Sequence, residues 1–433
     1  MIENFEQACN WLFGLHRFGI KLGLEQTVRL VELCGAADNK LKFIHLAGTN
    51  GKGPTGAMLE RSLRYNGFTT GFYSSPHLVS ACERIRINGK AVSESEFIEL
   101  ANVLDKAVEK MRSEGMQPTY FEAVTAMAML SFMRHNCDYV VWETGMGGRL
   151  DATNIVQPIA SVITNIALDH EKFLGNNLPA IASEKAGIVK KNAPVIIGQM
   201  ALEAEEVIRL KAAMVNTGFY RATDVAPLLE PEKSVMQVNY QKFICNGETI
   251  ELKLNGLMQQ RNAQLVIAVL NVLQLWNDKS LKALSETRWP ARIDLLKNNR
   301  FLLDGGHNPD GLNSLAETLK VLYPGKKFDW IFGAFADKDY SSGLKIIAPL
   351  ARSLSAVAFA EEARLSASLD DICAKAGALG IKECRKVDDL GAYLRDIEKT
   401  DPADGLPTVI AGSLYLAGEV LEILETPEYV LEL

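Results

Sequence analysis

The stretch KFIHLAGTNGKGPTGAM, residues 42–58, decides the fold of this chain. Residues 42–48 form a short apolar run that is typical of a buried strand. The loop after it is rich in glycine and carries Lys52, and Pro54 suits the first turn of a helix. Glycines let backbone N–H groups approach phosphate oxygens, and a helix N-terminus attracts an anion. The pattern predicts a phosphate-binding loop, but an ordinary glycine-rich turn has the same residues, so the rest of the chain decides.

Three further apolar runs, at residues 137–143, 159–166 and 193–198, have the length and β-branched character of buried strands. Helical patterns separate them, and such alternation predicts a mostly parallel sheet with helices on both faces. Residues 216–255 differ, because polar and apolar positions alternate there around an Asn-Gly pair. That pattern predicts a β-hairpin.

The length of 433 residues exceeds what one hydrophobic core usually organises, which indicates two domains. A Trp-Pro step at residues 289–290 disfavours a continued helix, and the strand–helix alternation restarts near residue 297. We therefore predict an α/β protein in three parts. These are a P-loop-type ATPase domain with a mostly parallel sheet over residues 1–288, a linker over 289–296 and a smaller Rossmann-like α/β domain over 297–433.

The composition is that of an ordinary globular protein, with 48% hydrophobic and 23% charged residues. A net charge of -7 argues against a general binder of nucleic acid or anionic membranes, which needs a basic face. The seven cysteines form no CxxC pair, which favours reduced thiols. Because no signal pattern or membrane-length apolar run is present, we expect a cytoplasmic protein without a membrane partner. We also expect a monomer that does not bind nucleic acid.

Further motifs follow the loop in a defined order along nearly the whole chain. They are YSSPHL (73–78), ERIRING (83–89), PTYFE (118–122), WETGMGGRLDATN (142–154), LDHEKFLG (168–175), IASEKAGIVK (181–190), QQRNA (259–263), WPARID (289–294), DGGHNP (304–309), ADKD (336–339) and GSLY (412–415). Together with GTNGK, this series resembles the folylpolyglutamate synthase and dihydrofolate synthase branch of the Mur ligase superfamily. The resemblance implies the Mur ligase architecture and ATP as a substrate.

The resemblance also implies where the nucleotide lies. Amide side chains suit the adenine edge because they both donate and accept hydrogen bonds, and an arginine fork suits phosphate oxygens. Two residues of the second domain, Asp304 and His307, are expected over the nucleotide or the incoming amino acid. The expected nucleotide contacts are Gly48, Thr49, Asn50, Gly51, Lys52, Gly53, Thr55, Gln259, Asn262, Arg292, Asp304 and His307.

Glu143 and His170 each follow the end of a predicted strand, on the sheet edge where ligands gather in open parallel sheets. A carboxylate and an imidazole beside a triphosphate are reasonable magnesium ligands. The resemblance implies that Lys185 is carbamylated and holds a second Mg²⁺, which requires a lowered pKa for its amine. We expect two Mg²⁺ ions at these three residues, and catalytic roles for Lys52, His170, Lys185 and Arg292.

The second substrate is expected near the YSSPHL and PTYFE motifs. Ser74, Ser75 and His77 can hydrogen-bond a pterin or aminobenzoate group. Phe121, together with Phe72 and Tyr73, can provide stacking or apolar walls. The alternative is that these aromatic side chains are simply part of the core.

One position departs from the family pattern, which carries serine where this chain has Pro54. Proline removes both the hydroxyl that would reach magnesium and the backbone N–H. Thr55 is a poor substitute, because its side chain points about 100° further round the helix. We therefore predict a nucleotide site that forms but binds or turns over Mg-ATP less well than the serine version.

The resemblance implies ATP-dependent addition of L-glutamate to a folate or to dihydropteroate through an acyl phosphate. The sequence leaves both acceptors open. Three alternatives remain, which are a Mur-type ligase with another acceptor, a nucleotide- or folate-binding protein that has lost catalysis because of Pro54, and a simple P-loop ATPase or kinase. Retention of Glu143, His170 and Lys185 argues against the second alternative.

Overall fold

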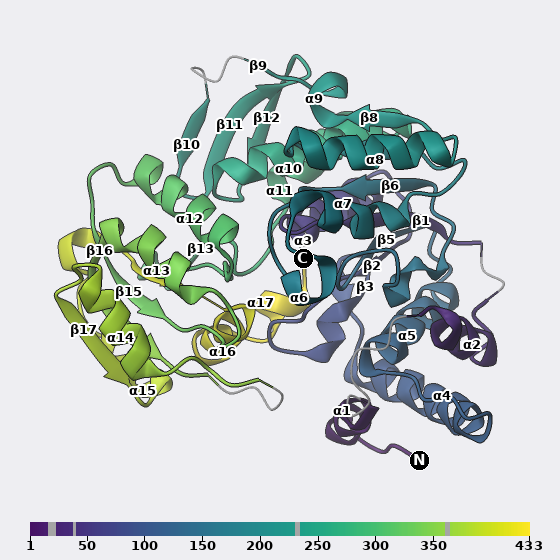
Figure 1. Ribbon diagram of the computed structural model, residues 1–433, viewed down its shortest axis with the longest axis horizontal. Helices are drawn as coiled ribbons and strands as arrows, with labels where there is room; N and C mark the ends of the chain where they lie inside the picture. The colour runs from purple at the N-terminus through teal and green to yellow at the C-terminus, as the bar shows by residue number, and fades with distance from the viewer. Residues whose placement is uncertain (16–22, 38–39, 230–233, 360–363) are drawn as a thin grey trace.

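Two α/β lobes make up the molecule, as the computed structural model in Figure 1 shows. The first lobe carries an eight-stranded sheet and the second a six-stranded sheet. The structure describes residues 1–15, 23–37, 40–229, 234–359 and 364–433. The predicted division into two α/β domains agrees with these two sheets.

The large sheet has the strand order β4-β3-β2-β5-β1-β6-β7-β8. Strands β2, β5, β1, β6, β7 and β8 run parallel, whereas β3 and β4 form an antiparallel edge. The four predicted strands are confirmed as β1, β5, β6 and β7. The bounds are β1 (Lys42–Ala47), β2 (Thr70–Tyr73), β3 (Ile85–Ile87), β4 (Lys90–Ala91), β5 (Tyr139–Glu143), β6 (Ala160–Ile163), β7 (Val195–Ile197) and β8 (Phe219–Arg221).

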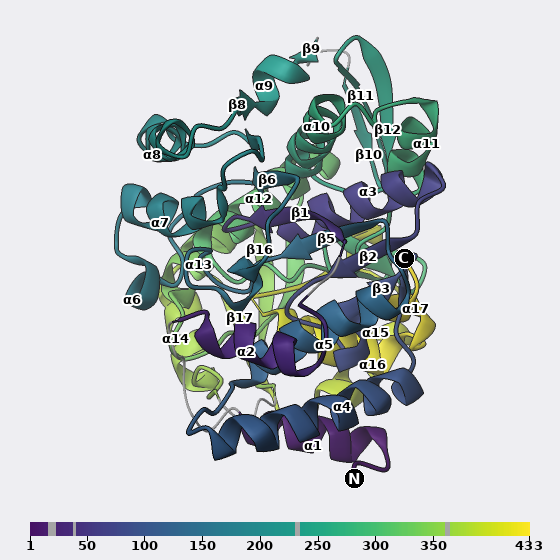
Figure 2. The same cartoon turned by 90° about the vertical axis from the view of Figure 1, so that its right-hand side faces the viewer.

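Both faces of this sheet are buried, because successive side chains of a strand point to opposite faces. In β5, Val140 and Trp142 pack into one core cluster and Val141 into another. Helices α1, α2, α4 and α5 lie on the first side and α3, α10 and α11 on the second (Figure 1 and Figure 2). The helices are α1 (Phe5–Gly14), α2 (Glu25–Leu33), α3 (Lys52–Tyr65), α4 (Glu94–Ser113), α5 (Tyr120–Arg134), α6 (Glu171–Leu174), α7 (Leu178–Lys185), α8 (Leu202–Met214), α9 (Ala222–Val225), α10 (Leu257–Val272) and α11 (Asp278–Glu286).

The predicted hairpin is confirmed and belongs to a small antiparallel sheet. Asn246 and Gly247 join β11 (Tyr240–Cys245) to β12 (Glu248–Leu252) with φ angles of 52° and 79°. Asn-Gly favours such a turn because both central residues need positive φ. Two short strands, β9 (Leu228–Leu229) and β10 (Val235–Gln237), complete the sheet.

The second lobe has a six-stranded sheet with the order β13-β14-β18-β15-β16-β17, parallel except for β13. Its strands are β13 (Asp294–Leu296), β14 (Phe301–Leu303), β15 (Phe328–Phe332), β16 (Ala351–Val357), β17 (Glu383–Val387) and β18 (Thr408–Ala411). Its helices are α12 (Pro309–Leu322), α13 (Tyr340–Ile347), α14 (Leu369–Ala378), α15 (Leu390–Glu398), α16 (Leu414–Leu424) and α17 (Glu428–Leu431).

The connection between the lobes is shorter than the predicted linker 289–296. Residues 294–296 form β13 and pair with β14, so they belong to the second sheet. The segment after α16 also returns to the first lobe, where Arg86 donates hydrogen bonds to the carbonyls of Val430 and Leu431. In the described part of the chain, no helix combines the length and apolar character needed to cross a membrane.

Candidate active site

A cavity of about 760 Å³ lies between the two lobes. Its walls include the loop after β1, the ends of β5 and β6, the connection between the lobes and the start of α12. Because the strands around β1 run parallel, their carboxyl ends meet at this edge, which is where ligands bind in open α/β sheets. The fold therefore gathers the predicted motifs from both domains around one space.

The phosphate-binding loop wraps the end of β1 and leads into α3. Gly51 has φ 83°, and a Cβ added there would lie 2.7 Å from the amide oxygen of Asn262. Both constraints require glycine at this position. Lys52, the first residue of α3, points back along the loop, and its Nζ donates to the carbonyl of Gly48 at 3.1 Å.

A second ammonium group reaches the same carbonyl. The Nζ of Lys185 donates to Gly48 O at 2.9 Å, and the side chain is buried at the end of α7. Burial, together with the charge of Lys52, lowers the pKa of Lys185 to about 7. Lys52 and Lys185 thus point their Nζ atoms at one carbonyl oxygen, and the charge of Lys52 is one that a nucleotide phosphate can pair with.

Glu143 ends β5 and is 3% exposed, with its Oε1 3.9 Å from Lys52 Nζ. Burial raises the pKa of Glu143 to about 7, and the charge of Lys52 opposes that shift. No cluster of three or more His, Cys, Asp or Glu side chains among the described residues forms a ready metal site. The oxygen donor of Glu143 nevertheless fits Mg²⁺, which usually keeps several waters and binds through one or two carboxylates plus phosphate.

His170 follows β6 and lies at the cavity, with a left-handed φ of 52° that begins α6. Desolvation lowers the pKa of His170, although the neighbouring Asp169 carboxylate acts in the opposite direction. A neutral imidazole is the form that binds metals. Its Nε2 lies 4.0 Å from Asp169 Oδ2.

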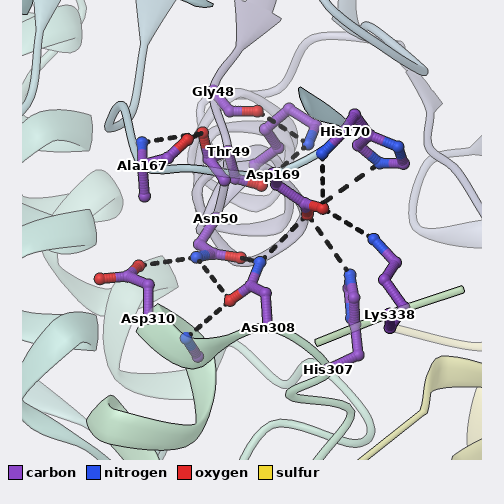
Figure 3. A network of polar contacts seen from close by, with 12 residues as sticks. Gly48, Thr49, Asn50, Ala167, Asp169, His170, His307, Asn308, Asp310 and Lys338 are labelled. Atoms are coloured by element: carbon purple, nitrogen blue, oxygen red, sulfur yellow. Dashed lines mark hydrogen bonds and ion pairs between the residues drawn. The ribbon is translucent and has the colours of Figure 1, made fainter. Parts of the chain in front are cut away.

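Asp169 itself contacts the second lobe, a role that the motif LDH did not reveal. Its Oδ1 lies 2.7 Å from Lys338 Nζ, and its Oδ2 accepts from Asn308 Nδ2 at 3.1 Å and lies 3.7 Å from His307 Nε2 (Figure 3). Burial alone would raise the pKa of Asp169, but the contact with His307 at 3.7 Å and the charges of His170 and Lys338 lower it below its usual range. His307 thus faces the cavity beside a permanent carboxylate.

Arg292 lies on the cavity wall in the connection between the lobes. The two residues beside it, Ala291 and Ile293, have φ angles of 56° and 50°, which are unusual for side chains with a Cβ and costly for a β-branched one. Asp304 braces this turn by accepting hydrogen bonds from Ile293 N at 3.0 Å and Gly306 N at 2.8 Å. Its carboxylate therefore supports the segment that carries Arg292.

The two predicted adenine-facing amides are both buried on α10 and both line the cavity. Asn262 Nδ2 donates to Gln259 Oε1 at 2.9 Å, which fixes the orientation of each amide. Thr49 and Gly53 line the same space. Gly53 also touches the connection between the lobes, because a Cβ there would lie 2.7 Å from the ring of Trp289.

Thr55 does not line the cavity, unlike the other predicted loop residues. Its hydroxyl is buried inside the first lobe and has no hydrogen-bond partner. The helical position sends the side chain away from the cavity, as the 100° step from Pro54 requires. Pro54 itself lines the cavity in the first turn of α3.

The residues predicted to contact the second substrate divide in a similar way. Ser75 and Phe121 line the cavity, whereas Ser74 and His77 do not, because the chain turns at the end of β2 and directs them elsewhere. His77 Nδ1 accepts a hydrogen bond from Arg84 Nε at 2.8 Å. Burial, together with the charge of Arg84, lowers the pKa of His77 to about 3.

The expected apolar wall is smaller than the sequence suggested. Phe72 and Tyr73 are both fully buried in β2 and belong to the core, with the Tyr73 ring 4.8 Å from that of Trp142. Arg84 lines the cavity and was not singled out. The motif ERIRING carried a signal for it, because Arg84 and Arg86 flank an apolar position and both are buried, which arginine rarely is without a partner.

A phosphate loop on a parallel sheet, a second α/β domain and a shared cavity define an ATP-dependent ligase of the Mur type. Family models agree, since the Mur ligase middle domain matches residues 46–270 and the Mur ligase, glutamate ligase domain matches residues 291–413. The dihydrofolate synthase/folylpolyglutamate synthase of Bacillus subtilis is 33% identical, over 98% of this chain and 100% of its own length. The chain belongs to the folylpolyglutamate synthase/dihydrofolate synthase family.

Solved structures of this family share the whole fold. The Mycobacterium tuberculosis folylpolyglutamate synthase complexed with ADP has a TM-score of 0.88 and 26% identity, and covers 97% of this chain and 98% of that chain. A folylpolyglutamate synthase complex with the ATP analogue AMPPCP and folate has a TM-score of 0.82 and 28% identity, over 98% of this chain and 100% of that chain. These likenesses support ATP as a substrate of this ligase.

Replacing Pro54 tests the departure from the family pattern. Pro54→Ser is expected to raise kcat/KM for Mg-ATP about 10- to 100-fold, because one charge-assisted contact is worth ~1.5–3 kcal/mol. The measurement is the rate of ADP release with saturating second substrates.

Pro54→Ala is the matched control, because it restores the backbone N–H but not the hydroxyl. An equal gain in the serine and alanine variants would assign the defect to the N–H, and no gain in either would refute the role given to Pro54.

Proposed function

We propose that this chain uses ATP to join L-glutamate to a folate or to dihydropteroate. The observation that carries the proposal is the convergence of Lys52 and Lys185 on the Gly48 carbonyl, beside Glu143, in a cavity that both lobes line. The relatives' names and the folate complex support the choice of substrates. Both acceptors remain part of the proposal.

The chemistry needs an activated acid, because a carboxylate in water is a poor electrophile. An oxygen of the acceptor carboxylate attacks the γ-phosphorus of ATP, the bond to the ADP oxygen breaks, and an acyl phosphate forms. The neutral amine of glutamate then attacks the acyl carbon, phosphate leaves, and the nitrogen loses a proton. Lys52 and Arg292 hold the transferring phosphoryl group, and positioning by fixed charges is the main source of such catalysis.

Magnesium fits the proposal, since Glu143 and His170 supply an oxygen and a nitrogen donor at the cavity. When bound, Mg²⁺ neutralises charge on the phosphates. Carbamylation of Lys185 would add a carboxylate donor, and its lowered pKa of about 7 gives it the neutral amine that the modification needs.

The second lobe offers a site for the carboxylates of glutamate. Ser413 is 3% exposed, precedes α16, and its buried hydroxyl has no hydrogen-bond partner. Arg364, which pairs with Asp337, and Lys338, which pairs with Asp169, line the same cavity. A helix N-terminus, a free hydroxyl and two cations suit an anionic amino acid.

Arg84 is proposed to bind the anionic end of the acceptor. Arg84 Nε donates a hydrogen bond to the neutral imidazole of His77, and the guanidinium carbon lies 5.3 Å from the centroid of the Tyr120 ring. Among the described residues, no carboxylate forms an ion pair with Arg84. Arg84→Met is therefore expected to raise KM for folate or dihydropteroate about 10- to 100-fold, by the loss of a charged hydrogen bond.

In Arg84→Met, KM for ATP should stay within about twofold of the parent value, because contacts at distant sites contribute independently to binding. Arg29→Met, at a surface ion pair with Glu114, is the control. An equal rise in both KM values would exclude a specific role for Arg84 at the acceptor.

The test of the proposed function is product identification. The protein is incubated with ATP, Mg²⁺ and L-glutamate in two separate reactions, one with dihydropteroate and one with tetrahydrofolate. The products are identified by mass spectrometry. An added glutamate residue and stoichiometric ADP are expected with at least one acceptor. ADP release that does not depend on glutamate, or the absence of an amide product with both acceptors, would refute the proposal.

Pro54 favours one second candidate, a nucleotide-binding relative without turnover. In that case nucleotide would bind with no amide product from either acceptor, and Pro54→Ser would restore product formation.

A further inference from the structure

A carboxylate from the second lobe lies on the phosphate-binding loop. Asp310, the second residue of α12, accepts a hydrogen bond at Oδ2 from Asn50 Nδ2 at 2.6 Å (Figure 3). The same oxygen accepts a second hydrogen bond from Asn165 Nδ2 at 3.3 Å. Asn50 belongs to the loop itself, and Asn165 follows β6. Asp310 therefore joins α12 to two segments of the first lobe.

Asn308 strengthens the same junction. Its Oδ1 accepts from Gly311 N at 2.8 Å and so caps α12, while its Nδ2 lies 3.2 Å from Asn50 Oδ1 and 3.1 Å from Asp169 Oδ2. The start of α12 is thus held against the loop by several short polar contacts.

The charge of Asp310 has no cationic partner in this junction. Its hydrogen-bond donors are neutral amides, and no lysine, arginine or histidine lies within ion-pair distance among the described residues. Asp310 also lines the cavity that the phosphates of a nucleotide would enter. A triphosphate brings several negative charges to the loop that Asp310 touches, and like charges at that range repel.

We propose that Asp310 is an interdomain latch, which holds α12 on the phosphate-binding loop through Asn50 and which the nucleotide phosphates displace. Binding of ATP then costs the Asp310 contacts and frees the second lobe to move. The inference rests on ATP binding at this loop and not on the identity of the acceptor or of the amino acid.

The test compares nucleotide affinities by calorimetry. Asp310→Asn removes the charge and keeps an amide of similar shape. It is expected to bind Mg-AMPPCP about threefold to tenfold more tightly, Mg-ADP by a smaller factor and AMP nearly unchanged, because the repulsion grows with phosphate charge. Since Asp310 is exposed on the cavity wall, the gain should shrink at high salt.

Two variants control the result. Asp370→Asn changes an exposed acid in the first turn of α14, which pairs with Lys386 away from the cavity, and should leave all three affinities unchanged. Asp310→Glu keeps the charge and should bind AMPPCP as the parent does.

Equal or weaker AMPPCP binding by Asp310→Asn would overturn the latch, as would a gain of the same size for all three nucleotides. If Asp310→Asn binds AMPPCP more tightly but the parent protein forms no glutamate-containing product, the latch is supported and the proposed function is refuted.

Discussion

Lys52→Met is expected to lower glutamate-dependent ADP release about 100- to 1000-fold, the usual loss when a single preorganised donor to a developing charge is removed. Lys52 Nζ lies 3.1 Å from Gly48 O and 3.9 Å from Glu143 Oε1, so it already points into the phosphate site. Methionine keeps the length and the helix propensity of the side chain but removes the charge.

Lys52→Met should still unfold in one cooperative thermal transition, because Lys52 lies at the cavity wall, although Glu143 loses its neighbouring charge. Lys172→Met, an exposed lysine of α6, is the control and should retain full activity. If Lys52→Met turned over at the rate of the parent, the proposed phosphate-binding role of this loop would be refuted.

Lys185→Ala is expected to lower turnover by a factor of similar size, about 1000-fold, if Lys185 supplies a metal-binding carbamate. The buried Nζ donates only to Gly48 O in the described structure, and its pKa is lowered to about 7. An ammonium group would repel Mg²⁺, whereas a carbamate on that nitrogen would supply an anionic oxygen ligand for the ion.

Two measurements distinguish a carbamylated Lys185 from a Lys185 with a free ammonium group. Short carboxylic acids such as acetate or propionate should restore part of the activity of Lys185→Ala, because they replace the lost oxygen ligand. In the parent, ¹³C-bicarbonate should give a protein-bound carbamate signal that Lys185→Ala lacks. Lys190→Met, a half-buried neighbour, is the control. Absence of both rescue and signal would refute the carbamate.

Much of the fold could be predicted because its signals are local. The apolar runs at β1, β5, β6 and β7 are short, β-branched and bounded by turn residues, and each is a strand. The Asn246–Gly247 turn likewise depends on two adjacent residues. The predicted linker is too long at residues 294–296, because backbone pairing with residues 301–303 places them in the second sheet.

The site is harder to predict where it depends on how two lobes meet. Asn50 and Asp310 are separated by 260 positions, and no periodicity in either segment indicates that they touch. Asp169 and Lys338 meet for the same reason. Such contacts arise from docking of whole domains, which sequence patterns of a single element do not encode.

Side-chain direction at turns is the other source of error. Ser74, Ser75 and His77 are near neighbours in the chain, yet only Ser75 lines the cavity. Residues beyond a strand end lose the strict alternation of the strand, so their direction depends on the local turn. The hydroxyl of Thr55 could be excluded in advance by the helical step, but its burial could not.

Activation of the acceptor carboxylate by phosphoryl transfer is the central step of the proposed reaction, and the fate of a carboxylate oxygen tests it directly. The acceptor is prepared with ¹⁸O in the reacting carboxylate and converted with ATP, Mg²⁺ and L-glutamate, and the released phosphate is analysed by mass. The account predicts one ¹⁸O atom in phosphate for each amide formed from fully labelled carboxylate, because the acyl–oxygen bond breaks when the amine attacks. Amide product accompanied by unlabelled phosphate would contradict it.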